Sequence, residues 1–320
     1  MPIISSLYNP PSVFKNGHFS TIYAATMRTV TDITQQRERI TLSDGDFIDL
    51  DWSFSKTKTT QLIIIFHGLE GSAKRPYILG TAKVFNEYGI DACAVNLRSC
   101  SGEQNTLFKS YHSGATSDVE EIIQHILSTK NYTQIILKGF SLGGNLVLKY
   151  LGEQQKLSSK IVCGIAVSVP CFLYGSMLEL HKPKNIIYNK RFKKDLIDKL
   201  KEKIKQHPIE GEKINIQLIK TLKDFDDYYT SKAHGFKDAL DYYTKSSSLQ
   251  YLKNISIPTL IINAKNDTFL SKECYPTKQA KENPHLFLEI PKYGGHVGFF
   301  DKNNIYYTEK RALEFVKSVI

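Results

Sequence analysis

The chain alternates between short apolar runs and longer stretches in which apolar residues recur every three or four positions. A continuous apolar run such as LIIIF at 62–66 is typical of a strand that is buried on both faces of a parallel sheet. Because such strands alternate with helical patterns, we predict a mainly parallel sheet with helices on both faces. The predicted strands are 62–66, 92–97, 134–137, 161–169, 259–263 and 286–290, and the predicted helices are 77–88, 117–127, one that begins at 143, and 306–319.

The amino-terminal part of the chain follows different patterns. Residues 39–42 and 47–52 alternate apolar and polar positions on either side of the turn dipeptide Asp44-Gly45. This alternation predicts an antiparallel hairpin ahead of the parallel strands. The first 30 residues contain three prolines and show no clear period, so we expect an irregular arm that wraps over the domain.

The strand pattern stops between residues 171 and 250, where the chain is rich in lysine and tyrosine and its apolar spacing is helical. Strands of the same apolar type resume after this stretch. An insertion into one sheet explains that return better than a separate domain does. We therefore predict a single domain over residues 1–320, with residues 171–250 as an inserted helical cap.

The composition is that of an ordinary globular protein, with 41% hydrophobic and 23% charged residues among 320. No apolar stretch approaches the roughly 20 residues needed to span a bilayer. The amino terminus lacks a basic segment followed by an apolar one, and we expect a cytoplasmic protein. The five cysteines have no CxxC spacing, which argues against a disulfide framework and a zinc site, so no metal and no cofactor are expected.

Much of the formal net charge of +10 lies in one segment, residues 182–205. Phe192, Leu196, Leu200 and Ile204 recur there every four positions, which predicts one amphipathic helix with a basic outer face. Solvation of that face is the simpler interpretation, and weak contact with an anionic membrane surface is the alternative. No nucleic-acid-binding motif accompanies the charge, so no nucleic-acid partner is expected.

The most informative motif is GFSLG at 139–143, which follows the predicted strand 134–137 and opens the predicted helix. A GxSxG match in a strand-turn-helix setting is typical of a nucleophile elbow. Its two glycines let strand and helix approach closely, while the serine takes an unfavourable backbone conformation that exposes its hydroxyl. We therefore predict that Ser141 is a nucleophile. A polar residue in a structural turn is the alternative.

A serine hydroxyl needs a histidine to take its proton and a carboxylate to orient that histidine. Asp267 follows the predicted strand 259–263, at the carboxyl end where functional residues of parallel sheets lie. His296 lies in a glycine-flanked loop after the last predicted strand. Because the order Ser, Asp, His is the one found with such elbows, we predict Asp267 and His296 as the partners of Ser141.

The reaction also needs N–H donors aimed at the oxyanion of the tetrahedral intermediate. The loop HGLEGS and the residue after the nucleophile are the usual sources, which predicts the backbone N–H groups of Leu69 and Leu142. The same loop partly resembles a phosphate-binding loop. That alternative fails because the second glycine comes too early and no Lys-Ser or Lys-Thr pair follows it.

Motifs spread over nearly the whole chain form a larger set. They are HGLEGS at 67–72, NLR at 96–98, YHSG at 111–114, the Ser141 elbow and GGH at 294–296, together with Asp226, Gly235-Phe236, Asp241-Tyr242-Tyr243, Ser247, Ile255, Pro258, Leu260, Ile262 and Asn266-Asp267. This set resembles the YheT-like branch of the α/β-hydrolases. The resemblance implies an α/β-hydrolase fold with an eight-stranded type of sheet, Ser141, Asp267 and His296 as catalytic triad, and hydrolysis of carboxylic esters. Ser99 departs from the family pattern, which often has glycine there, and no counterpart of the membrane anchor of some animal relatives is expected.

The sequence thus predicts a serine hydrolase that cleaves short- to medium-chain acyl esters of small molecules through an acyl-enzyme. An acyltransferase with the same site is one alternative, and a non-catalytic protein that docks through its basic helix is a weaker one. Phe140, Phe299 and Phe300 are predicted to contact the substrate. Aromatic residues of the cap are further candidates for an acyl pocket, although packing of the cap explains most of them: Phe172, Tyr174, Tyr188, Phe225, Tyr228, Tyr229, Phe236, Tyr242 and Tyr243.

Overall fold

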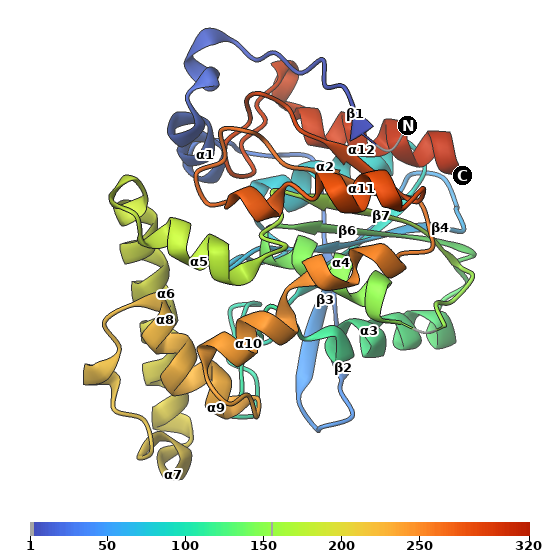
Figure 1. Ribbon diagram of the computed structural model, residues 1–320. Coiled ribbons are helices and arrows are strands. Elements are labelled where there is room, and N and C mark those ends of the chain that lie inside the picture. The colour runs from blue at the N-terminus through green and yellow to red at the C-terminus, as the bar shows by residue number, and fades with distance from the viewer. Residues whose placement is uncertain (1–2, 155) are drawn as a thin grey trace.

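One central sheet organises the molecule, as Figure 1 shows for the computed structural model. The structure describes residues 3–154 and 156–320, and within them nine strands pair in the order β1-β9-β8-β7-β6-β4-β5-β3-β2. Neighbouring strands are parallel except where β3 pairs with β2 and β5. The strands are β1 (Ile3–Ile4), β2 (Gln36–Thr41), β3 (Phe47–Ser53), β4 (Gln61–Phe66), β5 (Asp91–Asn96), β6 (Gln134–Phe140), β7 (Ile161–Val167), β8 (Thr259–Ile262) and β9 (Leu286–Glu289).

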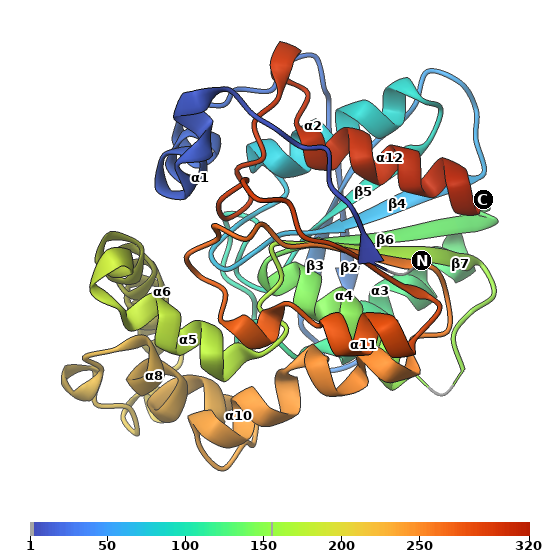
Figure 2. The ribbon, with the colours of Figure 1, turned by 45° about the horizontal axis from the view of Figure 1, so that its top comes forward.

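Helices cover both faces of this sheet, as Figure 2 shows. Successive side chains of a strand point to opposite faces, so each strand contributes to two cores. In β4, Ile63 and Ile65 pack on one face, whereas Ile64 and Phe66 pack on the other, and all four are fully buried. Complete burial of such a side chain contributes about 1.5–3 kcal/mol. One face carries α2 (Pro76–Glu87) and α12 (Tyr307–Val319), and the other carries α3 (Thr116–Thr129), α4 (Leu142–Glu153) and α11 (Thr277–Glu282).

The amino-terminal segment differs from the expected irregular arm. Residues 3 and 4 form β1, which pairs in parallel with β9 and makes the sheet nine-stranded instead of eight-stranded. Residues Gly17–Thr26 form helix α1, whose amino terminus is capped by the Asn16 side chain accepting from the Phe19 N–H at 3.0 Å. The helix escaped prediction because only Ser20 and Ala24 within it are buried, which leaves little apolar periodicity to detect.

After β7 the chain leaves the sheet and forms only helices and turns before it returns as β8. This helical insertion projects from the edge of the sheet domain in Figure 1. The predicted basic helix 182–205 begins later than expected, at Ile186, because a 3-10 turn over Pro183–Asn185 precedes it. The helices of the insertion are α5 (Leu173–His181), α6 (Ile186–Gln206), α7 (Pro208–Gly211), α8 (Leu222–Phe225), a π-helix over Asp226–Thr230, α9 (Ser231–Ala233) and α10 (Ala239–Ser246).

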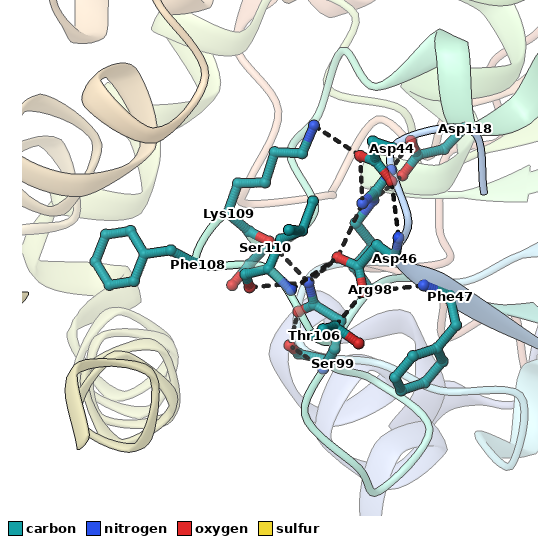
Figure 3. Close-up of polar contacts among 12 residues, drawn as sticks. Asp44, Asp46, Phe47, Arg98, Ser99, Thr106, Phe108, Lys109, Ser110 and Asp118 are labelled. Carbon is teal, nitrogen blue, oxygen red and sulfur yellow. Dashed lines mark hydrogen bonds and ion pairs between the residues drawn. The ribbon is translucent and has the colours of Figure 1, made fainter. Parts of the chain in front are cut away.

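A buried ionic network around Arg98 ties three parts of the fold together, as Figure 3 shows. The guanidinium donates to both carboxylate oxygens of Asp118 in α3 at 2.8 Å. It also lies 3.0 Å from Asp46 and 2.9 Å from Asp44, both in the turn between β2 and β3. Lys109 Nζ also lies 2.8 Å from Asp44. The loop after β5, the hairpin and α3 are thereby fixed relative to one another.

Within residues 3–154 and 156–320, no helix combines the length and the apolar character needed to cross a bilayer.

Candidate active site

The predicted nucleophile lies between β6 and α4, at the carboxyl edge of the sheet. Ser141 has φ = +52°, a left-handed conformation that is disfavoured for any residue with a Cβ atom. A Cβ atom at Gly139 would collide with the carbonyl of Gly143, so the strand and helix meet this closely only because glycine occupies the position. The turn therefore has the geometry of a nucleophile elbow, with Ser141 at its corner.

His296 and Asp267 lie directly behind Ser141. The Nε2 atom of His296 is 2.9 Å from Ser141 Oγ, and its Nδ1 atom is 2.8 Å from Asp267 Oδ2. A carboxylate accepts hydrogen bonds and donates none, so Nδ1 carries the proton and Nε2 is free to accept the serine proton. The side chain of Asp267 is fully buried, and that of His296 is 10% exposed. The three side chains thus form one continuous hydrogen-bonded chain.

The loop that carries His296 is held from several sides. The His296 backbone N–H donates to Thr21 Oγ1 of α1 at 2.8 Å. The His296 ring stacks on Phe269 with 4.3 Å between the ring centroids. The next residue, Val297, has φ = +62° and donates its N–H to Ser168 Oγ at 2.9 Å. A β-branched residue in this region is strained, so these contacts are needed to keep the loop in place.

The loop that carries Asp267 is fixed to the same neighbours. The Oδ1 atom of Asp267 accepts from the backbone N–H of Phe269 at 2.9 Å, which leaves Oδ2 for the histidine. The Asn266 side chain donates to the Lys15 carbonyl at 3.0 Å and accepts from the Gly295 N–H at 3.0 Å. Asn266 therefore links the acid loop, the histidine loop and the amino-terminal segment.

The two predicted oxyanion donors flank Ser141. The Leu142 N–H stands at the first position of α4, where helix N–H groups lack internal partners. Neither it nor the Leu69 N–H has a hydrogen-bond partner within the part of the chain that the structure describes. A Cβ atom on Gly68 would lie 3.0 Å from the Ser141 Cβ, so the Leu69 loop packs directly against the nucleophile.

His67 sets the orientation of the peptide between Gly68 and Leu69. Its Nε2 accepts from the Leu97 N–H at 3.1 Å, so its Nδ1 carries the proton and donates to the Gly68 carbonyl at 2.7 Å. The Gly71 N–H donates to the same carbonyl at 3.0 Å. Burial lowers the pKa of His67 to about 3, so the ring stays neutral at pH 7. Because the peptide is trans, fixing its carbonyl also fixes the opposite direction of the Leu69 N–H.

A cavity of about 470 Å³ opens over Ser141 and His296. Helices α1, α5, α6 and α10, with the π-helix, form its walls, so the helical insertion and the amino-terminal helix together cover the serine. Its volume is in the range of small-molecule sites. The aromatic side chains among its lining residues are Tyr77, Tyr111, Tyr188, Phe192, Phe225, Tyr242, Tyr243 and Phe269.

The three phenylalanines predicted to contact substrate do not line this cavity. Phe140 is fully buried in β6 and packs on Tyr77, because its side chain points to the opposite face of the sheet from the serine. Phe299 is fully buried against Tyr8, and Phe300 stacks on Phe14. These predictions were wrong because proximity in sequence to a catalytic residue does not fix the direction of a side chain.

Other residues at the site were missed by sequence reasoning or given no role. Thr21 lies in a segment without a recognisable period, and Phe269 follows the acid loop without belonging to a motif. Glu70 and Tyr111 belong to the HGLEGS and YHSG motifs, which marked their importance but not their function. Their contacts depend on segments far apart in the chain, so only the tertiary structure reveals them.

Cys100 is buried beside Lys199 of α6. Burial raises the pKa of its thiol to about 12, so it is protonated at pH 7 and a poor nucleophile. Within the described residues, no group of three histidine, cysteine or acidic side chains is arranged to hold a metal ion.

Comparison with known proteins relates this geometry to other chains. The family model for the alpha/beta hydrolase fold matches residues 61–303. The chain is 29% identical to “Putative esterase YheT” of Escherichia coli, over 92% of this chain and 87% of that protein. It is 27% identical to Phospholipase ABHD3 of Homo sapiens, over 100% of this chain and 80% of that protein. It is 28% identical to Monoacylglycerol lipase of Saccharomyces cerevisiae, over 75% of this chain and 55% of that protein.

Solved structures show the same architecture. Esterase Pf2001 of Pyrococcus furiosus superposes with a TM-score of 0.61 and 17% identity, covering 91% of this chain and 96% of the esterase. Est1E of Butyrivibrio proteoclasticus with bound ferulic acid superposes with a TM-score of 0.54 and 14% identity, covering 88% and 99%. At such identities the similarity shows the fold, and the chemistry has to be argued from the site.

Proposed function

Because the chain belongs to the α/β-hydrolase fold family and is a carboxylic ester hydrolase, we propose that it cleaves short- to medium-chain acyl esters through an acyl-enzyme on Ser141. The observation that carries this proposal is the hydrogen-bonded chain from Ser141 through His296 to Asp267 at the floor of the cavity. Family membership and the relatives named as esterase and lipase set the non-catalytic alternative aside.

Acylation begins when Ser141 Oγ forms a bond to the carbonyl carbon of the ester. His296 Nε2 takes the hydroxyl proton, and the electron pair of the carbonyl bond moves to the oxygen. The N–H groups of Leu69 and Leu142 donate to this oxyanion, and the amino terminus of α4 adds a favourable dipole. The intermediate collapses, the alkoxide leaves with the proton from His296, and the acyl group remains on Ser141.

Deacylation repeats these steps with water. His296 takes a proton from the water molecule as its oxygen attacks the acyl carbon, and the proton then returns to Ser141 Oγ as the carboxylic acid leaves. Asp267 accepts the Nδ1–H bond throughout, so it stabilises the imidazolium without taking the proton itself. The roles of Ser141, His296 and Asp267 follow from the hydrogen bonds that these three side chains make before substrate binds.

The lining of the cavity favours an apolar acyl group. Between α1 and the insertion, the cavity is lined by four apolar side chains, those of Ile22, Leu180, Ile187 and Phe192. Burial of each methylene of a chain there would contribute about 0.8 kcal/mol, which favours acyl chains long enough to reach these side chains. An alcohol that enters in place of water would give ester exchange, which is the acyltransferase alternative.

The test is hydrolysis of p-nitrophenyl esters from acetate to dodecanoate. We expect Ser141→Ala to lose at least about 10⁴-fold in kcat, and Asp267→Asn to lose about 10³–10⁴-fold. Ser128→Ala, on the exposed surface of α3, is the matched control. Equal rates for Ser141→Ala and the control would overturn the proposal. Ester formation in added ethanol that exceeds hydrolysis would favour the acyltransferase.

A weak membrane contact through α6 is a separate proposal. Ile186 and Ile187 at its amino-terminal end are 52% and 71% exposed, beside the basic Lys190 and Arg191. Exposed apolar residues flanked by lysine and arginine suit the interface of an anionic bilayer. Sedimentation with phosphatidylserine vesicles, compared with phosphatidylcholine vesicles, tests it. Equal binding to both vesicles, or none, contradicts it.

A further inference from the structure

Glu70 directly follows the predicted oxyanion donor Leu69 and has every polar group engaged. Its φ of +52° is disfavoured for a residue with a side chain, and the residue is 8% exposed. Its N–H donates to the Tyr111 hydroxyl at 2.8 Å, and that hydroxyl donates to Glu70 Oε1 at 2.7 Å. Arg75 donates to the Glu70 carbonyl at 2.7 Å. The unusual conformation is therefore held from outside the loop.

The remaining carboxylate oxygen of Glu70 is bound by the helical insertion. Lys199 of α6 places Nζ 2.9 Å from Glu70 Oε2, and the two side chains are 26% and 5% exposed. Lys199 Nζ also lies 3.4 Å from the Cys100 sulfur, but that thiol is neutral at pH 7. Burial disfavours the charged form of Lys199. The nearby Cys100 sulfur and Glu70 carboxylate more than offset this effect of burial, so the pKa of Lys199 lies above its ordinary value. Glu70 is thus the anion with which Lys199 pairs.

We propose that Glu70 and Lys199 are positioning residues, and that their ion pair couples the position of α6 to the direction of the Leu69 N–H. This inference rests on the proposed function, because it assumes that Leu69 donates to an oxyanion.

The peptide that carries the Leu69 N–H is held on its carbonyl side by His67 and the Gly71 N–H. On its other side it meets the Leu69–Glu70 peptide at the Leu69 Cα, and the N–H of that peptide is held by Tyr111. A shift of Glu70 therefore moves the Leu69 Cα and changes the direction of the Leu69 N–H. Helix α6 therefore covers the substrate and also completes the oxyanion site.

The proposal predicts where in the reaction the pair acts. The Leu69 N–H contacts the oxygen strongly only when negative charge develops on it, so misalignment raises the energy of the transition state more than that of the bound ester. Loss of the ion pair should accordingly lower kcat and leave KM nearly unchanged. A pair that only stabilised the fold would lower the amount of active enzyme without changing the binding of a transition-state analogue.

The decisive variants are Lys199→Met and Glu70→Gln, because the amide of glutamine still accepts from Tyr111 but carries no charge. We expect each to lower kcat about 10-fold on p-nitrophenyl butyrate, with KM within 2-fold of wild type. The inhibition constant of a trifluoromethyl ketone, which forms an oxyanion on the serine, should rise by the same factor. The double variant should lose no more than either single variant.

Two further variants control for charge and for folding. Lys199→Arg keeps the ion pair and should retain most of kcat. Lys201→Met removes an exposed lysine of the same helix whose ion-pair partner within residues 3–154 and 156–320 is Asp198, at 3.6 Å, and should match wild type. If Lys199→Met fails to fold, Glu70→Gln and the inhibition constant decide the matter alone.

The outcomes separate this inference from the proposed function. Activity that survives in Ser141→Ala overturns the proposed function itself. If Ser141→Ala is inactive but Lys199→Met and Glu70→Gln behave like Lys201→Met, only the coupling through the ion pair is wrong. A loss in Lys199→Met that Lys199→Arg shares equally also overturns it, because the charge would then be irrelevant.

Discussion

Left-handed backbone conformations cluster at the carboxyl edge of the sheet. Glu70, Ser99, Ser141, Ser168 and Val297 all have φ between +52° and +62°, and each follows a different strand. Such conformations are disfavoured for residues with a side chain and persist only where the surrounding contacts impose them. Glu70, Ser141 and Val297 among them line the cavity, which indicates that the site is held in shape by its neighbours, as preorganised catalysis requires.

Ser99 allows the cost of one such conformation to be measured. Its φ is +62°, and its hydroxyl bonds to the Asn105 side chain. Ser99→Gly and Ser99→Ala remove the same hydroxyl, but only glycine relieves the left-handed strain. We expect Ser99→Gly to be more stable than Ser99→Ala by about 1 kcal/mol in urea unfolding. Equal stability of the two variants would show that the strain is absent.

Lys138 of β6 makes stability depend on pH. It is fully buried, donates to Thr81 Oγ1 and the Thr308 carbonyl at 3.1 Å, and burial lowers its pKa to about 7. Between about pH 7 and 10.5 the folded chain has released this proton while the unfolded chain keeps it, so the free energy of unfolding rises with pH by at most about 1.4 kcal/mol per unit.

Replacement of Lys138 by methionine removes this titration. We expect the wild type to gain stability relative to Lys138→Met between pH 7 and pH 9, measured by urea unfolding at both values. Lys58→Met, at an exposed position, is the control that should keep the wild-type slope. Parallel pH profiles for wild type and Lys138→Met would contradict the assignment.

At the scale of elements, α1 contacts the loop that carries His296 although α1 belongs to none of the sheet's crossovers. Thr21 Oγ1 donates to the Gly17 carbonyl at 2.7 Å and accepts from the His296 N–H at 2.8 Å. Gly295 has φ = +57°, and a Cβ atom there would collide with Gly17. Helix α1 and the loop that carries His296 are therefore in close contact, and α1 fixes the position of the His296 imidazole.

Thr21→Val tests this support because valine keeps the shape of threonine but cannot accept the His296 N–H. We expect kcat to fall about 3- to 10-fold with little change in KM, since an unsatisfied buried donor costs about 1–3 kcal/mol and displaces the loop. Thr21→Ser keeps the acceptor and should stay close to wild type in ester hydrolysis. Equal losses in both variants would assign the effect to packing instead.

At the scale of the whole molecule, the Arg98 network joins the antiparallel hairpin to the parallel part of the sheet. Arg98 is 4% exposed, and three carboxylates surround it in Figure 3. Buried charges of this kind depend on complete pairing, because removal of one partner leaves the others desolvated and unpaired. The network also reaches the insertion, because the Leu107 N–H donates to Asp46 at 3.3 Å and the Leu107 carbonyl accepts from Lys203 of α6 at 2.6 Å.

Arg98→Met should destabilise the fold by about 3–5 kcal/mol, because it leaves Asp46 and Asp118 without their counter-charge. Urea unfolding followed by circular dichroism measures the change. Lys194→Met breaks an ion pair with Asp198 in which both partners are well exposed, and should leave the midpoint unchanged. A similar midpoint for the two variants would mean that the network contributes nothing beyond surface pairs.

The sequence by itself determined the parallel strands with helices between them and the chain order of the predicted triad residues Ser141, Asp267 and His296. The apolar run of β4, the elbow at Ser141 and the positions of Asp267 and His296 after later strands are local patterns, and parallel strands necessarily bring their carboxyl ends to one edge. The α/β-hydrolase fold followed from these patterns and from the family resemblance. A strand that is buried on both faces leaves a continuous apolar run, which the sequence shows directly.

Only the tertiary structure decided how the site is supported and what surrounds the serine. Helix α1 and the contacts of Lys199 with Glu70 join residues more than a hundred positions apart, and no local periodicity encodes such pairs. Phe140 and Phe299 point into the core instead of the cavity for the same reason. Side-chain direction and long-range contacts depend on packing against the rest of the molecule, which the chain expresses only once it is folded.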